Sequence, residues 1–94
     1  MARAEVDVRN PSGLHARPAA AFVRAAASLA VDVRVTNLSR DPERSASAKS
    51  VLGVMGLAVA RGHRIALEAD GPEAEAAVRS LAELVEGGLG EDVG

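Results

Sequence analysis

The chain has 94 residues, a formal net charge of −2, two histidines and no cysteine, and this length corresponds to one small domain. The absence of cysteine excludes disulfides, thiolate nucleophiles and cysteine-based zinc sites, and with two histidines a metal site is not expected. The charge balance and the single aromatic residue, Phe22, argue against nucleic-acid binding. We expect a monomeric cytoplasmic domain that uses no cofactor and does not insert into a membrane.

The first half of the chain predicts two strands on either side of a helix. Apolar and polar residues alternate over 3–9, which indicates a half-buried strand. The Asn-Pro-Ser-Gly segment at 10–13 is typical of a loop. An alanine-rich segment from 16 to about 29 predicts a helix, and valines alternate with polar residues over 31–36 in a second strand. A polar, exposed loop is expected over 37–44.

The second half of the chain predicts two more strands and two more helices. Residues 45–48 form a weak candidate for a third strand, and Ser50 is placed to cap a short helix that follows it. Alternation returns over 63–69 and predicts a fourth strand. Residues 71–73, Gly-Pro-Glu, open a final helix with an early proline and an acid in the first turn. Two glycines at 87–88 end it.

These elements, in the order βαββαβα, predict an α+β fold in which an antiparallel sheet carries helices on one face. The last helix supports this prediction because its apolar residues recur at helical spacing and need a surface to pack on. Those residues are Ala74, Ala77, Val78, Leu81 and Val85. We expect one domain over 1–94 that ends in a flexible tail from about residue 87.

The segment 13–19, Gly-Leu-His-Ala-Arg-Pro-Ala, contains the candidate site. Its loop brings His15 to the N-terminal end of the first helix, where unpaired amides and the helix dipole attract phosphate. The dipole also favours the neutral imidazole, whose free nitrogen is a nucleophile. Arg17 adds a guanidinium that suits phosphate oxygens. The pattern favours a phosphoryl group accepted on His15 and held by Ser12, Ala16 and Arg17.

A histidine two positions before an arginine is, taken alone, more typical of an ordinary surface near a helix cap. The wider pattern runs through 13–23, through Ser-Ala-Ser-Ala-Lys-Ser-Val-Leu-Gly-Val-Met at 45–55, through Arg-Gly at 61–62 and through Gly-Leu-Gly-Glu at 88–91. It resembles the HPr family, the histidine-containing phosphocarriers of the bacterial sugar phosphotransferase system. The resemblance covers nearly the whole chain without rearrangement.

The resemblance implies an open-faced β-sandwich, with four antiparallel strands and three helices on one side. It implies that His15 is phosphorylated, that Arg17 assists the phosphoryl group, and that the chain is a phosphocarrier and not an enzyme. The donor would be enzyme I, which is charged by phosphoenolpyruvate, and the acceptors would be enzyme IIA domains of sugar permeases. Ser50 matches the family's regulatory serine, the target of an HPr kinase/phosphorylase, although helix capping alone suffices to explain a serine there.

A second predicted feature is a surface on which partners dock beside the phosphoryl site. The second helix is too short to bury every side, so part of its apolar set is expected to face outward. The resemblance implies the same, with Ala20 or Phe22 on the rim, and Arg17 and Arg24 are placed to steer acidic partners. The predicted docking residues are Ala20, Phe22, Arg24, Val51, Leu52 and Met55.

Three further points bear on function. His63 begins a strand on its polar side, and we expect it to be exposed and without a role. The loop over 37–45 is about four residues longer than the tight turn common in the family, and we expect it to lie away from His15. An alternative acceptor belongs to a dihydroxyacetone or nitrogen-related phosphotransfer route, where His15 would act identically. A more distant alternative is a small α+β ligand-binding regulatory domain.

Overall fold

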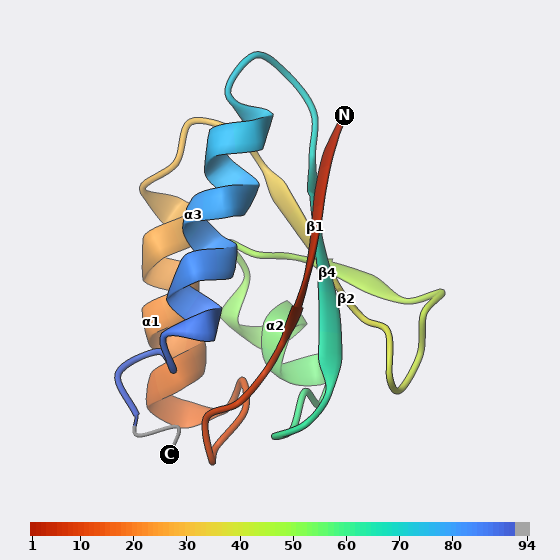
Figure 1. Cartoon of the computed structure of the whole chain (residues 1–94), viewed down its shortest axis with the longest axis vertical. Coiled ribbons are helices and arrows are strands. Elements are labelled where there is room, and N and C mark those ends of the chain that lie inside the picture. The colour runs from red at the N-terminus through yellow and green to blue at the C-terminus, as the bar shows by residue number, and fades with distance from the viewer. Residues whose placement is uncertain (92–94) are drawn as a thin grey trace.

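Seven elements follow one another in the computed structural model, which describes residues 1–91 (Figure 1). In chain order they are β1 (Ala2–Asp7), α1 (Ala16–Ala27), β2 (Val33–Asn37), β3 (Ser45–Ser47), α2 (Val51–Gly56), β4 (Arg64–Ala69) and α3 (Ala74–Glu86). The predicted order of strands and helices is confirmed. The first helix stops short of Leu29 because Ser28 ends it, donating both its backbone N–H and its hydroxyl to the carbonyl of Ala25.

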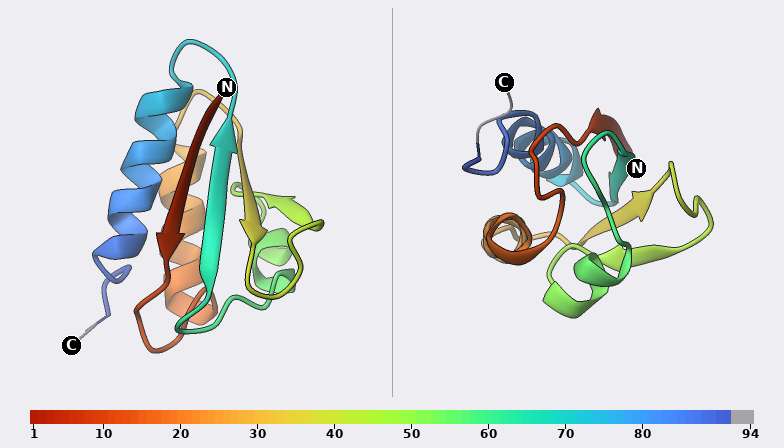
Figure 2. Two further views of the ribbon diagram at one scale, coloured as in Figure 1. Left: turned by 45° about the vertical axis from the view of Figure 1, so that its right-hand side comes forward. Right: turned by 90° about the horizontal axis from the view of Figure 1, so that it is seen from below.

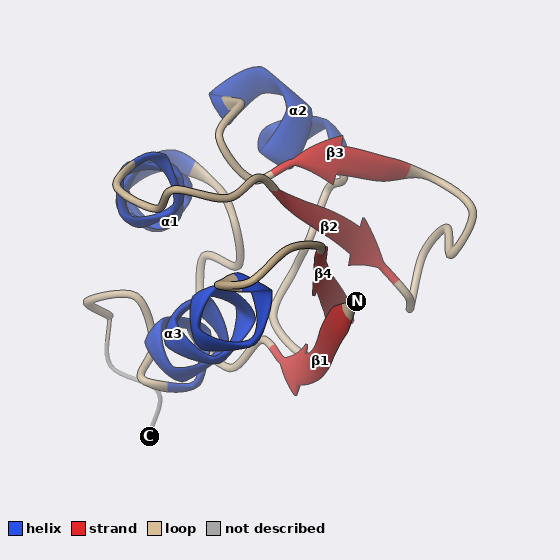
Figure 3. Cartoon of the chain, turned by 90° about the horizontal axis from the view of Figure 1, so that it is seen from above, coloured by secondary structure: helices blue, strands red, loops and turns tan. Residues whose placement is uncertain are grey.

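The four strands form one antiparallel sheet in the order β1-β4-β2-β3. β4 lies between β1 and β2, with Val6 opposite Ile65 and Val35 opposite Leu67. The helices lie on one side of this sheet: α3 packs on β1 and β4, α2 lies against β3, and α1 contacts both other helices (Figure 3). The predicted α+β architecture, an open-faced β-sandwich, is confirmed.

The hydrophobic core lies between the sheet and the helices. Strand residues of the inward phase, among them Val6, Ile65 and Leu67, are buried. The buried residues of α3 are the five predicted from its spacing, Ala74, Ala77, Val78, Leu81 and Val85. Because side chains alternate along strands and recur every three to four residues on helices, each element buries one apolar face in this layer.

The opposite, open face of the sheet carries a network of charged side chains. Arg3 on β1 forms ion pairs with Glu5 at 2.8 Å and Glu68 at 3.2 Å, and Arg64 on β4 pairs with Glu5 at 3.1 Å and Asp7 at 2.7 Å. The guanidinium of Arg3, followed by that of Arg64, holds the pKa of Glu5 below its usual value. These side chains are partly exposed, so they keep this face solvated and add little to stability.

The chain folds back on itself after α3. The sequence predicts a flexible tail from about residue 87, but residues 87–91 pack against the body of the domain. Leu89 is buried, and its N–H donates to the carbonyl of Leu84 at 3.2 Å. Glu91 reaches the loop that precedes α1. The rest of the predicted tail, 92–94, lies outside the described residues. Within residues 1–91 no helix combines the length and the apolar character needed to cross a membrane.

Candidate functional site

His15 occupies the N-cap position of α1, at the end of the molecule where the chain leaves β1 (Figure 2). Its backbone is extended (φ −129°, ψ 156°), and its exposed side chain makes no capping hydrogen bond. The N–H groups of Ala16 and Arg17 find no acceptor among the described residues because they begin the helix, and Pro18 has no N–H. The imidazole is therefore accessible next to unpaired amides and an exposed arginine, a setting that suits a phosphoryl group.

The backbone on both sides of His15 is set by tertiary contacts. Gly13 has φ +60°, and a Cβ there would lie 2.2 Å from the carbonyl oxygen of Val59. The next residue, Leu14, is fully buried and donates its N–H to that same carbonyl at 3.0 Å. Ala16 has φ +53°, a left-handed conformation that costs a non-glycine residue about 1 kcal/mol and persists where the surroundings enforce it. The contacts of Gly13 and Leu14 with Val59 therefore fix the position of His15 before the helix begins.

A carboxylate from the far end of the chain contacts this loop. Glu91 Oε1 accepts hydrogen bonds from the Asn10 side-chain amide and from the Ser12 backbone N–H, both at 3.0 Å. Its Oε2 accepts from the Ser12 hydroxyl at 2.8 Å. Hydrogen bonding to Asn10, and then to Ser12, lowers the pKa of Glu91. Both donors of Ser12, which the sequence assigns to a phosphoryl group, are thus directed to Glu91. In the sequence, the Gly-Leu-Gly-Glu pattern marks this glutamate, but nothing local connects it to Ser12.

α2 presents apolar side chains at the surface. Ser50 caps this helix as predicted, and its Oγ accepts the N–H of Gly53 at 3.0 Å. The side chains that follow are exposed, Val51 by 43% and Leu52 by 85%. Met55 is half-buried and packs against the core. The outward-facing part of this apolar set is therefore Val51 and Leu52. They lie on α2, a helix that contacts α1 (Figures 2 and 3).

α1 contributes less apolar surface than predicted. Phe22 is fully buried, so the prediction that it lies on the rim of a docking surface is wrong. The buried face of α1 consists of Pro18, Ala19, Phe22, Val23 and Ala26. Ala20 is half-buried and Arg24 is exposed. Neither Arg17 nor Arg24 takes part in an ion pair within residues 1–91, so both charges are available to a partner.

His63 has a structural role that its place in the sequence does not suggest. It is half-buried just before β4, and its Nδ1 accepts the N–H of Ala60 at 3.1 Å. The Asn37 side-chain amide lies 3.0 Å from the same nitrogen and also donates to the carbonyl of Leu57 at 3.1 Å. The prediction of an exposed residue without a role is wrong, because the buried Asn37 and the loop before β4 converge on the ring.

The long loop between β2 and β3 lies next to α2. Its Arg40 and Arg44 line a hollow of about 280 Å³ together with Gly56 and Leu57 at the C-terminal end of that helix. Asn37, which holds His63, lines the same hollow. The loop therefore borders the helix that carries the exposed Val51 and Leu52, and it places Arg40, Asp41 and Arg44 beside the end of that helix.

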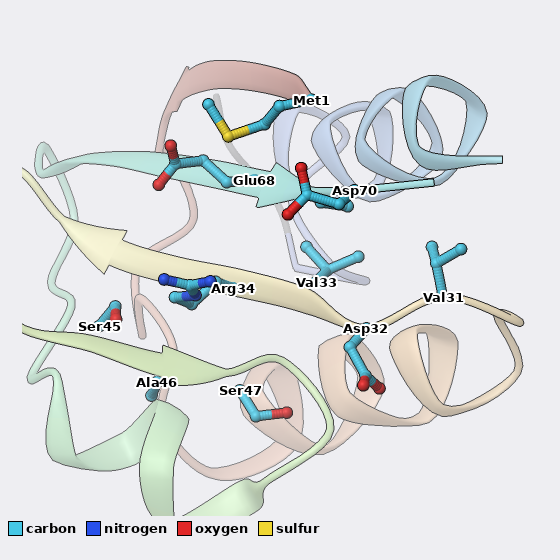
Figure 4. A pocket seen from close by; sticks show the side chains of 11 residues that line it. Met1, Val31, Asp32, Val33, Arg34, Ser45, Ala46, Ser47, Glu68 and Asp70 are labelled. Atoms are coloured by element: carbon cyan, nitrogen blue, oxygen red, sulfur yellow. The ribbon is translucent and has the colours of Figure 1, made fainter. Parts of the chain in front are cut away.

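A hollow of about 610 Å³ lies at the other end of the sheet, where β1 begins and β4 ends (Figure 4). Its charged lining comes from Arg34 on β2, Asp32 before that strand, and Glu68 and Asp70 at the end of β4. No histidine lines it, and within residues 1–91 no group of three or more His, Cys, Asp or Glu side chains is placed to hold a metal. The chemistry suited to phosphoryl transfer is therefore at the start of α1.

Known proteins match this chain in sequence over almost its whole length. Residues 2–87 match the family described as the PTS HPr component phosphorylation site. The phosphocarrier protein HPr of Streptomyces coelicolor is 44% identical over 91 residues, which cover 97% of this chain and 95% of that protein. The multiphosphoryl transfer protein of Haemophilus influenzae is 40% identical over 86 residues. Those residues are 92% of this chain, but the chain spans only 17% of that longer protein.

Comparison of the fold with solved structures also finds HPr proteins. The crystal structure of HPr-C-His from Thermoanaerobacter tengcongensis has a TM-score of 0.87 and 35% sequence identity, and covers 98% of this chain and 99% of that one. HPr from Bacillus anthracis has a TM-score of 0.81 at 36% identity, over 89% of this chain and 95% of that one. Members of the family carry phosphoryl groups and are not enzymes. The chain belongs to the HPr family of phosphocarrier proteins of the phosphotransferase system.

Proposed function

We propose that His15 accepts a phosphoryl group from phospho-enzyme I and donates it to enzyme IIA domains of sugar permeases. The lone pair of a ring nitrogen attacks the phosphorus, the bond between phosphorus and the donor atom breaks, and a phosphorus–nitrogen bond forms on His15. In the second transfer an acceptor nucleophile attacks the same phosphorus and the bond to His15 breaks. The chain then returns to its starting form, as a carrier requires.

The observation that carries this proposal is the exposed His15 at the N-cap of α1, next to unpaired amides. A phosphoryl group in transfer spreads negative charge over its oxygens, so positioning and electrostatic stabilisation supply most of the rate. The N–H groups of Ala16 and Arg17 and the Arg17 guanidinium are positive groups at that position. Because a single copy of the chain contains all of them, we propose that it acts as a monomer. We also propose that it acts in the cytoplasm, where the cytoplasmic phosphoryl donor phosphoenolpyruvate would charge enzyme I.

The test is incubation with phosphoenolpyruvate and enzyme I, followed by intact-mass measurement. The wild-type chain should gain one acid-labile phosphoryl group, and His15→Ala should gain none. His63→Leu is the matched control, because it removes the other histidine and should leave the labelling in place. The proposal fails if the wild-type chain is not labelled, or if His15→Ala carries the same label.

We also propose that partners dock on α2 and the adjoining face of α1. Val51 and Leu52 expose apolar side chains there, half-buried Met55 adds a flexible one, and Ala20 on α1 leaves room for close approach. Arg17 and Arg24 supply cations that no residue of the described chain neutralises. These charges favour partners with acidic surfaces and speed their association.

A charge at the centre of this surface tests the docking proposal. Leu52→Asp should raise the KM for enzyme I by about tenfold or more, because it puts a carboxylate where an apolar contact and an acidic partner are expected. Its free energy of unfolding should stay within about 0.5 kcal/mol of wild type, since the side chain is exposed. Ala76→Asp on the exposed side of α3 is the control and should leave the KM unchanged. An unchanged KM in Leu52→Asp would place docking elsewhere.

Ser50 is proposed as the target of an HPr kinase/phosphorylase. Its exposed hydroxyl lies at the start of α2, immediately before Val51 and Leu52. Phosphorylation would add roughly −2 charge beside the docking surface and would repel acidic partners. Incubation with ATP and the kinase should give an acid-stable adduct that Ser50→Ala lacks, and the modified chain should be a poorer substrate of enzyme I. A wild-type chain that gains no adduct contradicts the proposal.

A further inference from the structure

Three hydrogen bonds join the last described residue of the chain to the loop that carries His15. Glu91 accepts one bond from the Asn10 side-chain amide and two from Ser12, one from its backbone N–H and one from its hydroxyl. The donor residues and Glu91 are about 80 positions apart in the sequence, so this contact is purely tertiary. Both carboxylate oxygens are used, and each bond is charge-assisted, which makes it stronger than a bond between neutral groups.

The segment after α3 is shaped so that it delivers this carboxylate. Leu89 is buried and anchors the segment, and its N–H donates to the carbonyl of Leu84 at 3.2 Å. Three consecutive residues have left-handed backbones, Gly88 at φ +92°, Leu89 at φ +53° and Gly90 at φ +90°. The N–H of Glu91 closes the turn on the carbonyl of Gly88 at 2.9 Å. Leu89 is the one residue of the three for which this conformation is costly, and its burial holds it there, so this turn is a defined part of the fold.

The loop that receives the carboxylate depends on it for order. Asn10 is fully buried, and its side-chain amide donates both to Glu91 and, at 2.9 Å, to the carbonyl of Gly13. The only backbone bond within this loop is the N–H of Gly13 to the carbonyl of Asn10, at 3.2 Å. Ser12 is exposed, and among the described residues its N–H and hydroxyl have no other partner than Glu91. Among the described residues, residues 10–14 make six hydrogen bonds just before His15, and without the carboxylate they would lose three of them.

We propose that Glu91 is a positioning residue for phosphoryl transfer: its carboxylate fixes Asn10 and Ser12, and through them the loop that places His15 at the N-cap of α1. The proposal rests on the proposed function of His15. It also gives Ser12 a different part from the one expected of it. The Ser12 hydroxyl holds the loop through Glu91, and the phosphoryl oxygens are left to Arg17 and the first amides of α1.

We call the three hydrogen bonds of Glu91 to Asn10 and Ser12 the clamp. The first test follows the clamp in the unphosphorylated chain and needs no partner protein. The Ser12 amide proton donates to a carboxylate, so its NMR chemical shift should titrate with the ionisation of Glu91 at acid pH. In Glu91→Gln, which keeps the size of the side chain and removes its charge, this titration should be absent, and the Ser12 and Gly13 amide signals should move. Glu86→Gln is the matched control, because Glu86 is exposed at the end of α3 and should leave the titration unchanged.

The second test measures transfer. Glu91→Gln should lower the first-order rate of His15 phosphorylation by phospho-enzyme I about tenfold, since displacement of a reacting group by about 1 Å costs up to a hundredfold. Its KM for enzyme I should stay within about twofold, because Glu91 is not on the docking surface. A KM change of the same size as the rate change, or an unchanged rate in a variant whose Ser12 signal has moved, overturns the proposal. If the wild-type chain is not phosphorylated at all, the proposed function fails. The clamp is then judged by the Ser12 titration, whose absence in wild type overturns it.

Discussion

Gly13→Ala is expected to be among the most damaging single-methyl additions in this chain. The residue has φ +60°, and the new Cβ would lie 2.2 Å from the carbonyl oxygen and 3.0 Å from the carbonyl carbon of Val59, and 2.8 Å from the Cα of Ala60. All three are backbone atoms, which cannot move aside as the end of a flexible side chain can. The loop must therefore shift away from 59–60, and the Leu14 N–H must lengthen its 3.0 Å bond to Val59.

The cost can be worked out from these contacts. A left-handed backbone costs alanine about 1 kcal/mol relative to glycine, overpacking costs about 1–3 kcal/mol, and loss of the Leu14 hydrogen bond costs about 1 kcal/mol. The expected loss in the free energy of unfolding is about 3–5 kcal/mol. Gly62→Ala is the matched control, because its φ of +91° is also left-handed but no atom lies within 4 Å of the added Cβ. It should lose about 1 kcal/mol.

Urea denaturation of both variants measures this difference. Both substitutions reduce the entropy of the unfolded chain alike, so this effect cancels in the comparison. In thermal unfolding Gly13→Ala should melt roughly 8 °C or more below Gly62→Ala, given 4–8 °C per kcal/mol for a domain of this size. If the two variants lie within about 1 kcal/mol of each other, the close approach of the His15 loop to Val59 does not exist in solution.

Three further predictions follow from the described contacts. Phe22→Ala should lower the free energy of unfolding, measured by urea denaturation, by about 3–5 kcal/mol because the ring fills the core. A loss below about 1 kcal/mol would mean that Phe22 is exposed in solution. His63→Leu should lose about 1–3 kcal/mol in the free energy of unfolding, because the buried Asn37 amide and the Ala60 N–H lose the acceptor that they share, and wild-type stability in this variant would contradict that role. Because the loop lowers the pKa of Glu91 below its ordinary 4.5, its stabilisation is complete above that pH and is lost as the pH falls through the lowered value. The free energy of unfolding should therefore fall less between pH 7 and about pH 3 in Glu91→Gln than in wild type, and parallel pH profiles would refute the interaction.

Regular periodicity explains why so much of the fold could be predicted. Strand residues such as Val6, Ile65 and Leu67 follow a period of two, and the buried face of α3 follows from helical spacing because its other side is polar. Alanine-rich α1 lacks such contrast. With alanine at 16, 19–21 and 25–27, most of its faces are equally apolar, so the sequence does not settle which way Phe22 points.

The parts of the site that the sequence did not predict depend on contacts between distant segments. His15 was found because a helix end and its neighbours in the sequence form its surroundings. Glu91 reaches Ser12 across 79 positions, and His63 reaches Asn37 across 26. No local pattern encodes such a pair, since each partner alone reads as an ordinary polar residue at the surface. Only the packing of Leu89 and of the loop before β4 brings them together.

The charged open face of the sheet has a consequence for the order of events in phosphoryl carriage. Arg3, Glu5, Asp7, Arg64 and Glu68 are linked there by four ion pairs, so this part of the face offers an arriving protein a surface of mixed charge, unlike the exposed Val51 and Leu52 of α2. Under the docking proposal above, donor and acceptor use the same side of the carrier, around α1 and α2. The two cannot be bound at once, and each must leave before the other arrives. An excess of unphosphorylated acceptor would therefore compete with phospho-enzyme I for the carrier and slow its phosphorylation. The rate of phosphoryl transfer from donor to acceptor would then depend on how many carrier molecules are unbound.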